Sequence, residues 1–329
     1  MSLVRGFLPV LASLVAGMPV PSTAQKPERA RIGLLSLHDP VIERTGNIGA
    51  SAFRAGMQAL GYVEGRNFEL HERHADGEPA RLVALAHELV AEQVGVIVAF
   101  GTDATRDARH ATETIPIVMA GVGDPVRSGF VAGLARPATN VTGTALSTEE
   151  TAVKQLEALK EAAPGMRRVA VLRRPIGGHG RMMISFKNAE GVLGIEISEF
   201  VIATPDDLQP RLEEMRAAGA EGLVVLPSPL LDDLRWEIAD FALRHGFPAA
   251  GWQPAHSQAG FLVSYGPNLG QMHARSATYV HKILTGVKPA DLPVEQPERF
   301  QLTINLKTAR ALGLTMPPTL LARADEVIE

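Results

Sequence analysis

Short apolar runs alternate with amphipathic stretches along most of the chain. Residues 31–37, 94–100 and 115–120 are apolar runs with the length and branching expected of buried parallel strands. Between them, residues 82–90 repeat apolar side chains at the i, i+3, i+4, i+7 spacing of a helix that buries one face. Because these spacings are too long for hairpins, the strands should pair in parallel through right-handed crossovers.

The same alternation restarts in the second half of the chain. Helices are expected near residues 149–162 and 205–218, and strands near 168–172, 196–202 and 222–226. Two similar units in series indicate two lobes of one design. The pattern therefore predicts an α/β fold of two Rossmann-like lobes, each with a parallel sheet flanked by helices.

The C-terminal part of the chain is too short for a third lobe and should pack onto the first two. Residues 248–252, 260–265 and 300–305 are predicted strands, and 268–284 is a predicted helix. A glycine-rich segment at 177–180 lacks the Lys-Ser/Thr that follows in a phosphate-binding loop. We expect it to be a mobile loop at the rim of a cleft.

The N-terminus has the layout of a secretory signal peptide. Met1–Arg5 carries one positive charge, residues 6–20 are almost wholly apolar, and residues 21–24 are small or polar. The alternative is a membrane anchor, but the apolar segment is short and interrupted by Pro9. We therefore expect export to the periplasm with cleavage after Ala24.

The composition, the net charge and the absence of known motifs argue against several classes of function. The 329 residues are 46% hydrophobic and 21% charged, which is ordinary for a globular protein. A net charge of −4 gives no basic surface for nucleic acid, so no nucleic-acid partner is expected. The chain has no cysteine, and its ten histidines form no group with metal-ligand spacing. No catalytic motif is found, so we predict neither an enzyme nor a cofactor or metal site.

Turns after the predicted strands supply candidate ligand contacts, because open α/β sheets bind ligands at the carboxyl ends of their strands. The free N–H groups before a helix and the Thr102 hydroxyl could hold a carboxylate, or Thr102 and Asp103 could merely cap that helix. Asp124 could receive an ammonium group or fix its own turn. The candidates in these turns are His38, Asp39, Gly101, Thr102, Asp103, Gly123, Asp124, Arg173, Arg174 and Ser228.

The alternatives for the remaining turn residues also stay open. An arginine directly after a strand could pair bidentately with a ligand carboxylate, but an exposed surface charge is the commoner fate of Arg173 or Arg174. His38 and Asp39 could contact a ligand or lie in a solvated loop.

Five segments far apart in the chain carry a resemblance to a known family. Residues 61–67 (GYVEGRN), 101–105 (GTDAT), 115–143, 265–269 (YGPNL) and 288–314 resemble ABC-transporter substrate-binding proteins of the type I periplasmic-binding fold. The resemblance is to the branch that includes tryptophan- and tyrosine-binding members. It implies a monomeric periplasmic protein that closes two lobes over a solute and presents it to an ABC permease in the inner membrane.

The resemblance also implies where the chain crosses between the lobes. Three hinge crossings are expected near Thr142, near residues 252–253 and around 288–297. The expected lobes are then residues 30–142 plus 252–288 for the first, and residues 143–251 plus 289–329 for the second.

Four further candidates follow from the hinge positions. Ser147 matches a small polar residue that the family commonly has after its first crossing. Trp252, Gln253 and Tyr265 lie beside predicted crossings, where Trp252 or Tyr265 could stack on a ligand ring or pack within the hinge. The implied ligand class is an amino acid or aromatic carboxylate, although residues 251–258 depart from the usual pattern. The rival functions are a periplasmic ligand sensor and an enzyme on the same fold.

Overall fold

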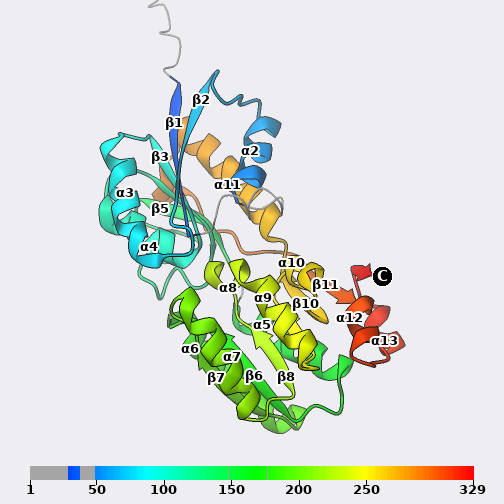
Figure 1. Ribbon diagram of the computed structural model, residues 1–329. Coiled ribbons are helices and arrows are strands. Elements are labelled where there is room, and N and C mark those ends of the chain that lie inside the picture. Colours follow the sequence, from blue (N-terminus) through cyan, green and yellow to red (C-terminus); the bar gives the residue numbers. More distant parts are fainter. Residues whose placement is uncertain (1–28, 38–48, 147, 176) are drawn as a thin grey trace, which may run out of the picture.

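The computed structural model describes residues 29–37, 49–146, 148–175 and 177–329. The chain forms two α/β lobes, one above the other in Figure 1, and each lobe is built on its own sheet. This confirms the predicted two-lobe architecture. The predicted signal peptide, residues 1–24, lies outside the described residues.

The first sheet is entirely parallel and has the strand order β2-β1-β3-β4-β5. Its central strands come from the apolar runs of the sequence, and every residue of β3 and β4 is buried. Helices α3 and α4 cover one face, and α2 and α11 cover the other (Figure 1). The elements are β1 (Ala30–Ser36), α2 (Ala50–Ala59), β2 (Phe68–His74), η1 (Pro79–Arg81), α3 (Leu82–Ala91), β3 (Val96–Phe100), α4 (Gly101–Ala111), β4 (Ile117–Val122), β5 (Val141–Ala145) and α11 (Leu269–Leu284).

The second sheet has the order β12-β11-β10-β9-β8-β6-β7, and all its pairings are parallel except β10 with β11. Helices α5, α6, α12 and α13 bury their apolar faces on one side, and α7 and α9 on the other. The elements are α5 (Thr148–Ala162), β6 (Arg168–Arg173), α6 (Gly177–Leu193), β7 (Glu196–Val201), η2 (Pro205–Asp207), α7 (Leu208–Ala217), β8 (Gly222–Val225), α8 (Pro229–Asp233), α9 (Arg235–Arg244), β9 (Ala249–Gly251), α10 (Pro254–Ala259), β10 (Val263–Pro267), η3 (Pro289–Asp291, in the strap leading to β11), β11 (Phe300–Asn305), α12 (Leu306–Ala311), α13 (Pro318–Leu321) and β12 (Glu326–Ile328).

Three segments connect the lobes, and two of them are hydrogen-bonded to each other. The first follows β5, the second lies between β10 and α11, and the third runs from η3 to β11. The Ala145 N–H donates to the Glu295 carbonyl oxygen at 2.8 Å, and the Glu295 N–H donates to that of Gly143 at 3.0 Å. The first and third crossings therefore form a short ladder at the hinge.

The second crossing lies later in the chain than the sequence predicted. The expected position at 252–253 is followed by α10, which returns the chain to the second sheet as β10. Residues 254–267 therefore belong with the second lobe, and the chain crosses beside Asn268 instead. Gly143–Ala145, assigned to the second lobe from the sequence, are the end of β5 in the first sheet.

Two further predictions differ from the structure. The glycine-rich segment 177–180 is not a loop but the first turn of α6, because the apolar residues that follow it continue a helix. The antiparallel β10–β11 pair was not expected from a pattern of parallel units. Within the described ranges, no helix has the length and apolar character needed to cross a membrane.

Candidate ligand-binding site

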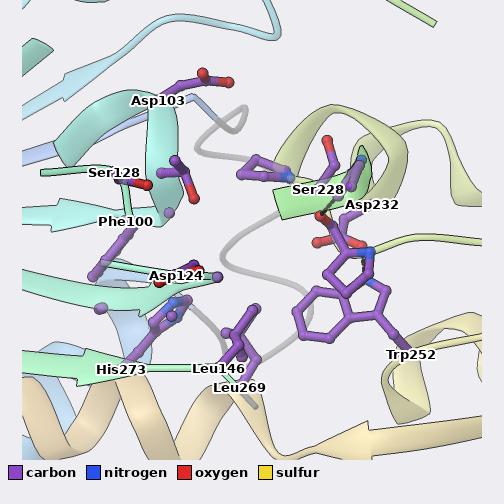
Figure 2. Close-up of a pocket in the computed structure, with 18 of the residues that line it drawn as sticks. Phe100, Asp103, Asp124, Ser128, Leu146, Ser228, Asp232, Trp252, Leu269 and His273 are labelled. Carbon is purple, nitrogen blue, oxygen red and sulfur yellow. Dashed lines mark hydrogen bonds between the residues drawn. The ribbon is translucent and has the colours of Figure 1, made fainter. Parts of the chain in front are cut away.

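A cavity lies between the lobes, where the carboxyl ends of β3 and β4 face the turn after β8. The cavity itself measures about 70 Å³, within about 760 Å³ of space between the lining atoms that is partly open solvent. Figure 2 shows Phe100, Asp124 and His273 on one side of the space, and Ser228, Asp232 and Trp252 on the other.

The first-lobe wall is built on the start of α4. This helix begins at Gly101 directly after β3, so its first N–H groups have no partner within the helix and its positive dipole end lies at the cavity. Gly101 has a φ of +79°, and a Cβ there would lie 3.1 Å from Cγ of Pro229. Glycine at this position therefore permits both the turn and the close approach of the second lobe.

A stacked ring pair extends the first-lobe wall. The Phe100 and His273 rings lie 4.2 Å apart with an angle of 18° between their planes. The Gly49 N–H donates to Nδ1 of His273 at 2.6 Å, which fixes the ring that α11 contributes. The cavity wall thus includes a helix from late in the chain. The sequence predicted this helix, but no pattern indicated that His273 would reach the cavity.

The second-lobe wall places a buried hydroxyl and a buried indole at the cavity. Ser228 is 2% exposed, and its hydroxyl has no hydrogen-bond partner in the described part of the chain. Trp252 is 3% exposed, and its Nε1–H donates to Oδ1 of Asp232 at 2.7 Å. Leu146 and Leu269 from the crossings pack with Trp252 and complete an apolar floor.

Two salt bridges join the lobes beside the cavity. Nη1 of Arg174, from the turn after β6, lies 2.5 Å from Oδ2 of Asp103 in α4, and both side chains are almost fully buried. Arg181 of α6 pairs with Asp124, which follows β4. The structure therefore shows the two lobes closed against each other.

His179 holds two second-lobe turns together. The Arg174 N–H donates to Nδ1 of His179 at 3.0 Å, so that nitrogen is an acceptor. Nε2 lies 2.9 Å from the Pro227 carbonyl oxygen, which can only accept, so Nε2 carries the proton. Burial lowers the pKa of His179 to about 4, which agrees with a neutral ring.

Seven of the predicted residues line the cavity: Gly101, Thr102, Asp103, Gly123, Asp124, Ser228 and Trp252. The cavity also has lining residues that sequence reasoning missed: Phe100, Ser128, His179, Asp232 and His273 among them. His179 was hidden in the segment interpreted as a loop. Asp232 lies on α8, a helix of five residues, which is too short for a periodic pattern to mark.

The two adjacent arginines, which were candidates for ligand contact, do not line the cavity. Arg173 pairs with Glu199 at 2.8 Å, within the second lobe. Arg174 is buried, but its partner is Asp103 of the protein, so its charge is already balanced without a ligand. Its role in this structure is to bridge the lobes.

Gln253 and Tyr265 also lie away from the cavity lining. Gln253 precedes α10 and is buried, and the Tyr265 ring stacks on Phe300 at 5.9 Å. Gln253 and Tyr265 lie away from the cavity because the second crossing comes later in the chain than predicted. The predicted contacts His38, Asp39 and Ser147 lie outside the described residues.

The family of the chain follows from its sequence match. The family described as ABC transporter substrate binding protein matches residues 47–328. The chain belongs to this family. Its members bind small-molecule solutes and interact with ABC permeases.

Individual relatives agree with the family and with the fold. The chain is 22% identical to a "Tyrosine-binding protein" of Clostridioides difficile over 271 residues, which are 80% of this chain and 75% of the relative. A Streptococcus pneumonia ABC domain solved in complex with L-Trp superimposes with a TM-score of 0.82 at 22% identity, covering 92% of this chain and 100% of that one. A conserved domain protein of Vibrio cholerae gives 0.83 at 28% identity, covering 91% and 100%.

These likenesses identify the architecture of the substrate-binding protein as the type I periplasmic-binding fold. Within the described residues, no group of histidine, aspartate and glutamate side chains could hold a metal ion.

Proposed function

We propose that this chain is the solute-binding component of an ABC importer and that it closes its lobes over a small organic solute. It would act as a monomer in the periplasm after removal of residues 1–24, and would deliver the solute to a permease in the inner membrane. N-terminal sequencing of protein from a periplasmic extract would test the export step, with Gln25 expected as the first residue.

The proposed ligand class is an amino acid or an aromatic carboxylate. The start of α4 offers free N–H groups to a carboxylate, and Thr102 adds a hydroxyl. Phe100, Trp252 and Leu146 provide apolar surface for a ring or an aliphatic group. Relatives named for tyrosine and solved with L-Trp support this class.

The observation that carries the proposal is the unpartnered hydroxyl of Ser228. A buried hydroxyl without a hydrogen bond costs about 1–3 kcal/mol. Ser228 belongs to the second lobe, and Gly101 of the first lobe lies close to the following Pro229. A ligand between them would satisfy polar groups of both lobes only when the lobes are closed, and this differential binding is what drives closure.

The same hydroxyl gives no support to an enzyme. A serine nucleophile needs a hydrogen-bonded base, and Ser228 has none among the described residues. We therefore propose binding without covalent chemistry.

A thermal-shift screen followed by calorimetry tests the function. A ligand at one hundred times its dissociation constant stabilises the folded state by about 2.7 kcal/mol. Amino acids and aromatic acids should raise the melting temperature, whereas sugars and purines should not. A shift only with sugars or purines would refute the ligand class, and turnover of the bound compound would refute the binding-only function.

A further inference from the structure

Trp252 lies where the cavity, the hinge and the second lobe meet. Its indole lines the cavity and packs with Leu146, Leu269 and Met272 in one buried cluster. Leu146 directly follows β5 at the first crossing, and Leu269 opens α11 directly after the second. The orientation of this one ring therefore affects both the floor of the cavity and the packing of two hinge segments.

One hydrogen bond fixes that orientation. Nε1–H is the only polar group of the indole, and it donates to Oδ1 of Asp232 at 2.7 Å. Asp232 is 1% exposed. Without this acceptor the buried indole N–H would lose the hydrogen bond that it makes here, and a buried donor left unsatisfied costs about 1–3 kcal/mol.

The surroundings hold Asp232 rigidly. Its N–H donates to the Ser228 carbonyl oxygen at 2.9 Å, and its own carbonyl oxygen accepts from Nη1 of Arg235 at 2.6 Å. Nε2 of His256, a fully buried ring, lies 3.5 Å from Oδ1. The backbone of Asp232 is thus held on both sides within the second lobe, and the buried His256 ring lies beside its carboxyl group.

We propose that Asp232 is a positioning residue, whose carboxylate holds the Trp252 indole in the orientation that completes the cavity floor and packs on the hinge crossings. Through this ring, the second lobe packs against the two hinge crossings at Leu146 and Leu269. The expected effect of Asp232 on ligand affinity rests on the proposed function, whereas its expected effect on the orientation and mobility of the Trp252 ring does not.

The chain contains two tryptophans, which makes the ring directly observable. Trp236 on α9 is 55% exposed and does not line the cavity, so Trp236→Phe leaves Trp252 as the sole indole. In that background, Asp232→Ala should raise acrylamide quenching of Trp252 severalfold and lower its fluorescence anisotropy. Asp232→Asn keeps an oxygen acceptor and should change both less than twofold. Asp240→Ala, at an exposed site of α9, is the matched control.

Calorimetry with L-tyrosine as the probe adds the binding readout. Asp232→Ala should weaken binding about tenfold, a loss of about 1.4 kcal/mol. In the Trp252→Phe protein, which has no indole N–H at the cavity, Asp232→Ala should have little further effect, because the two residues act through one bond.

The rival role for Asp232 is a direct ligand contact, since its side chain also lines the cavity. Weaker binding with unchanged quenching and anisotropy would establish that role and overturn the proposal. An Asp232→Ala protein whose Trp252 signal matches the parent would overturn it as well, with or without a ligand. If L-tyrosine does not bind at all, the proposed ligand class is in question, but the fluorescence comparison still decides the role of Asp232.

Discussion

Arg174→Gln should destabilise the closed form through a side chain that does not itself line the cavity. The guanidinium is buried between the lobes and lies 2.5 Å from Asp103, whereas neither Arg174 nor its neighbours in the turn line the cavity. Removing it deletes an interaction that exists only when the lobes are together. The loss of this ion pair destabilises only the closed form, and within the second lobe the substitution removes a hydrogen bond of 3.4 Å from Nη2 of Arg174 to the Ala203 carbonyl oxygen.

The free-energy cost of the substitution depends on the hydrogen bonds that Asp103 retains. Removing one partner of a buried ion pair can cost about 3–5 kcal/mol, because the other charge is left unpaired. Here Oδ1 of Asp103 still accepts from Nη1 of Arg106 at 2.7 Å, so no unpaired buried carboxylate remains. We expect a smaller cost of about 1–2 kcal/mol, which shifts the closing equilibrium and the ligand dissociation constant by about 5- to 30-fold.

Arg173→Gln is the matched control, because Arg173 pairs with Glu199 inside the second lobe. Calorimetry should show weaker binding for Arg174→Gln and wild-type binding for Arg173→Gln. Small-angle scattering without ligand should give a larger radius of gyration only for Arg174→Gln. Equal affinities and equal radii for the two variants would refute the role of Arg174 in closure.

Three other predictions address the pH response, the helix packing and the unpartnered hydroxyl. Burial lowers the pKa of His179 from 6.5 to about 4, so the folded state disfavours its protonation. The contribution of His179 to stability should therefore fall by about 1.4 kcal/mol per pH unit as the pH drops from about 6.5 toward 4. Melting scans of His179→Gln should show a shallower slope than the parent, and equal slopes would contradict this. A Cβ at Gly56 would lie 2.4 Å from the Ala274 carbonyl oxygen, so Gly56→Ala should lower the melting temperature. Gly191 of α6 has open space around it, so Gly191→Ala should stabilise the protein by about 0.5–1 kcal/mol. The reverse order of melting temperatures would show that α2 and α11 can separate without cost. Ser228→Ala should leave the melting temperature of the ligand-free protein unchanged or raise it. Calorimetry should show ligand binding about tenfold weaker, a loss of about 1.4 kcal/mol. Unaltered affinity would show that Ser228 does not contact the ligand.

The sheets were predictable because their signal is local. Buried parallel strands need continuous apolar runs, and the runs at 94–100 and 115–120 became β3 and β4 with shifts of a few residues at their ends. The turns after them follow from the rule that parallel strands present their carboxyl ends together. Gly101 and Asp124 were found at the cavity for that reason.

The partners of side chains were not predictable, because they depend on how the lobes meet. The sequence shows Arg173 and Arg174 as equivalent, but only the second faces Asp103 across the interface. His273 reaches the cavity because α11 returns to the first lobe after five of the seven strands of the second sheet, β6 to β10, have passed in the chain. The second crossing was misplaced since α10 is a single short helix with no long apolar stripe to mark it.

The route of α11 has a consequence for the order in which the protein folds. Ala277, Tyr279 and Val280 of α11 bury the same face of the first sheet as Phe53 and Met57 of α2. They lie more than two hundred residues after α2 in the chain, so most of the second lobe is synthesised before them. Contacts so distant in sequence form slowly and late. The first lobe should therefore remain incomplete during synthesis, and an isolated fragment ending at Ala145 should expose an apolar sheet face and aggregate.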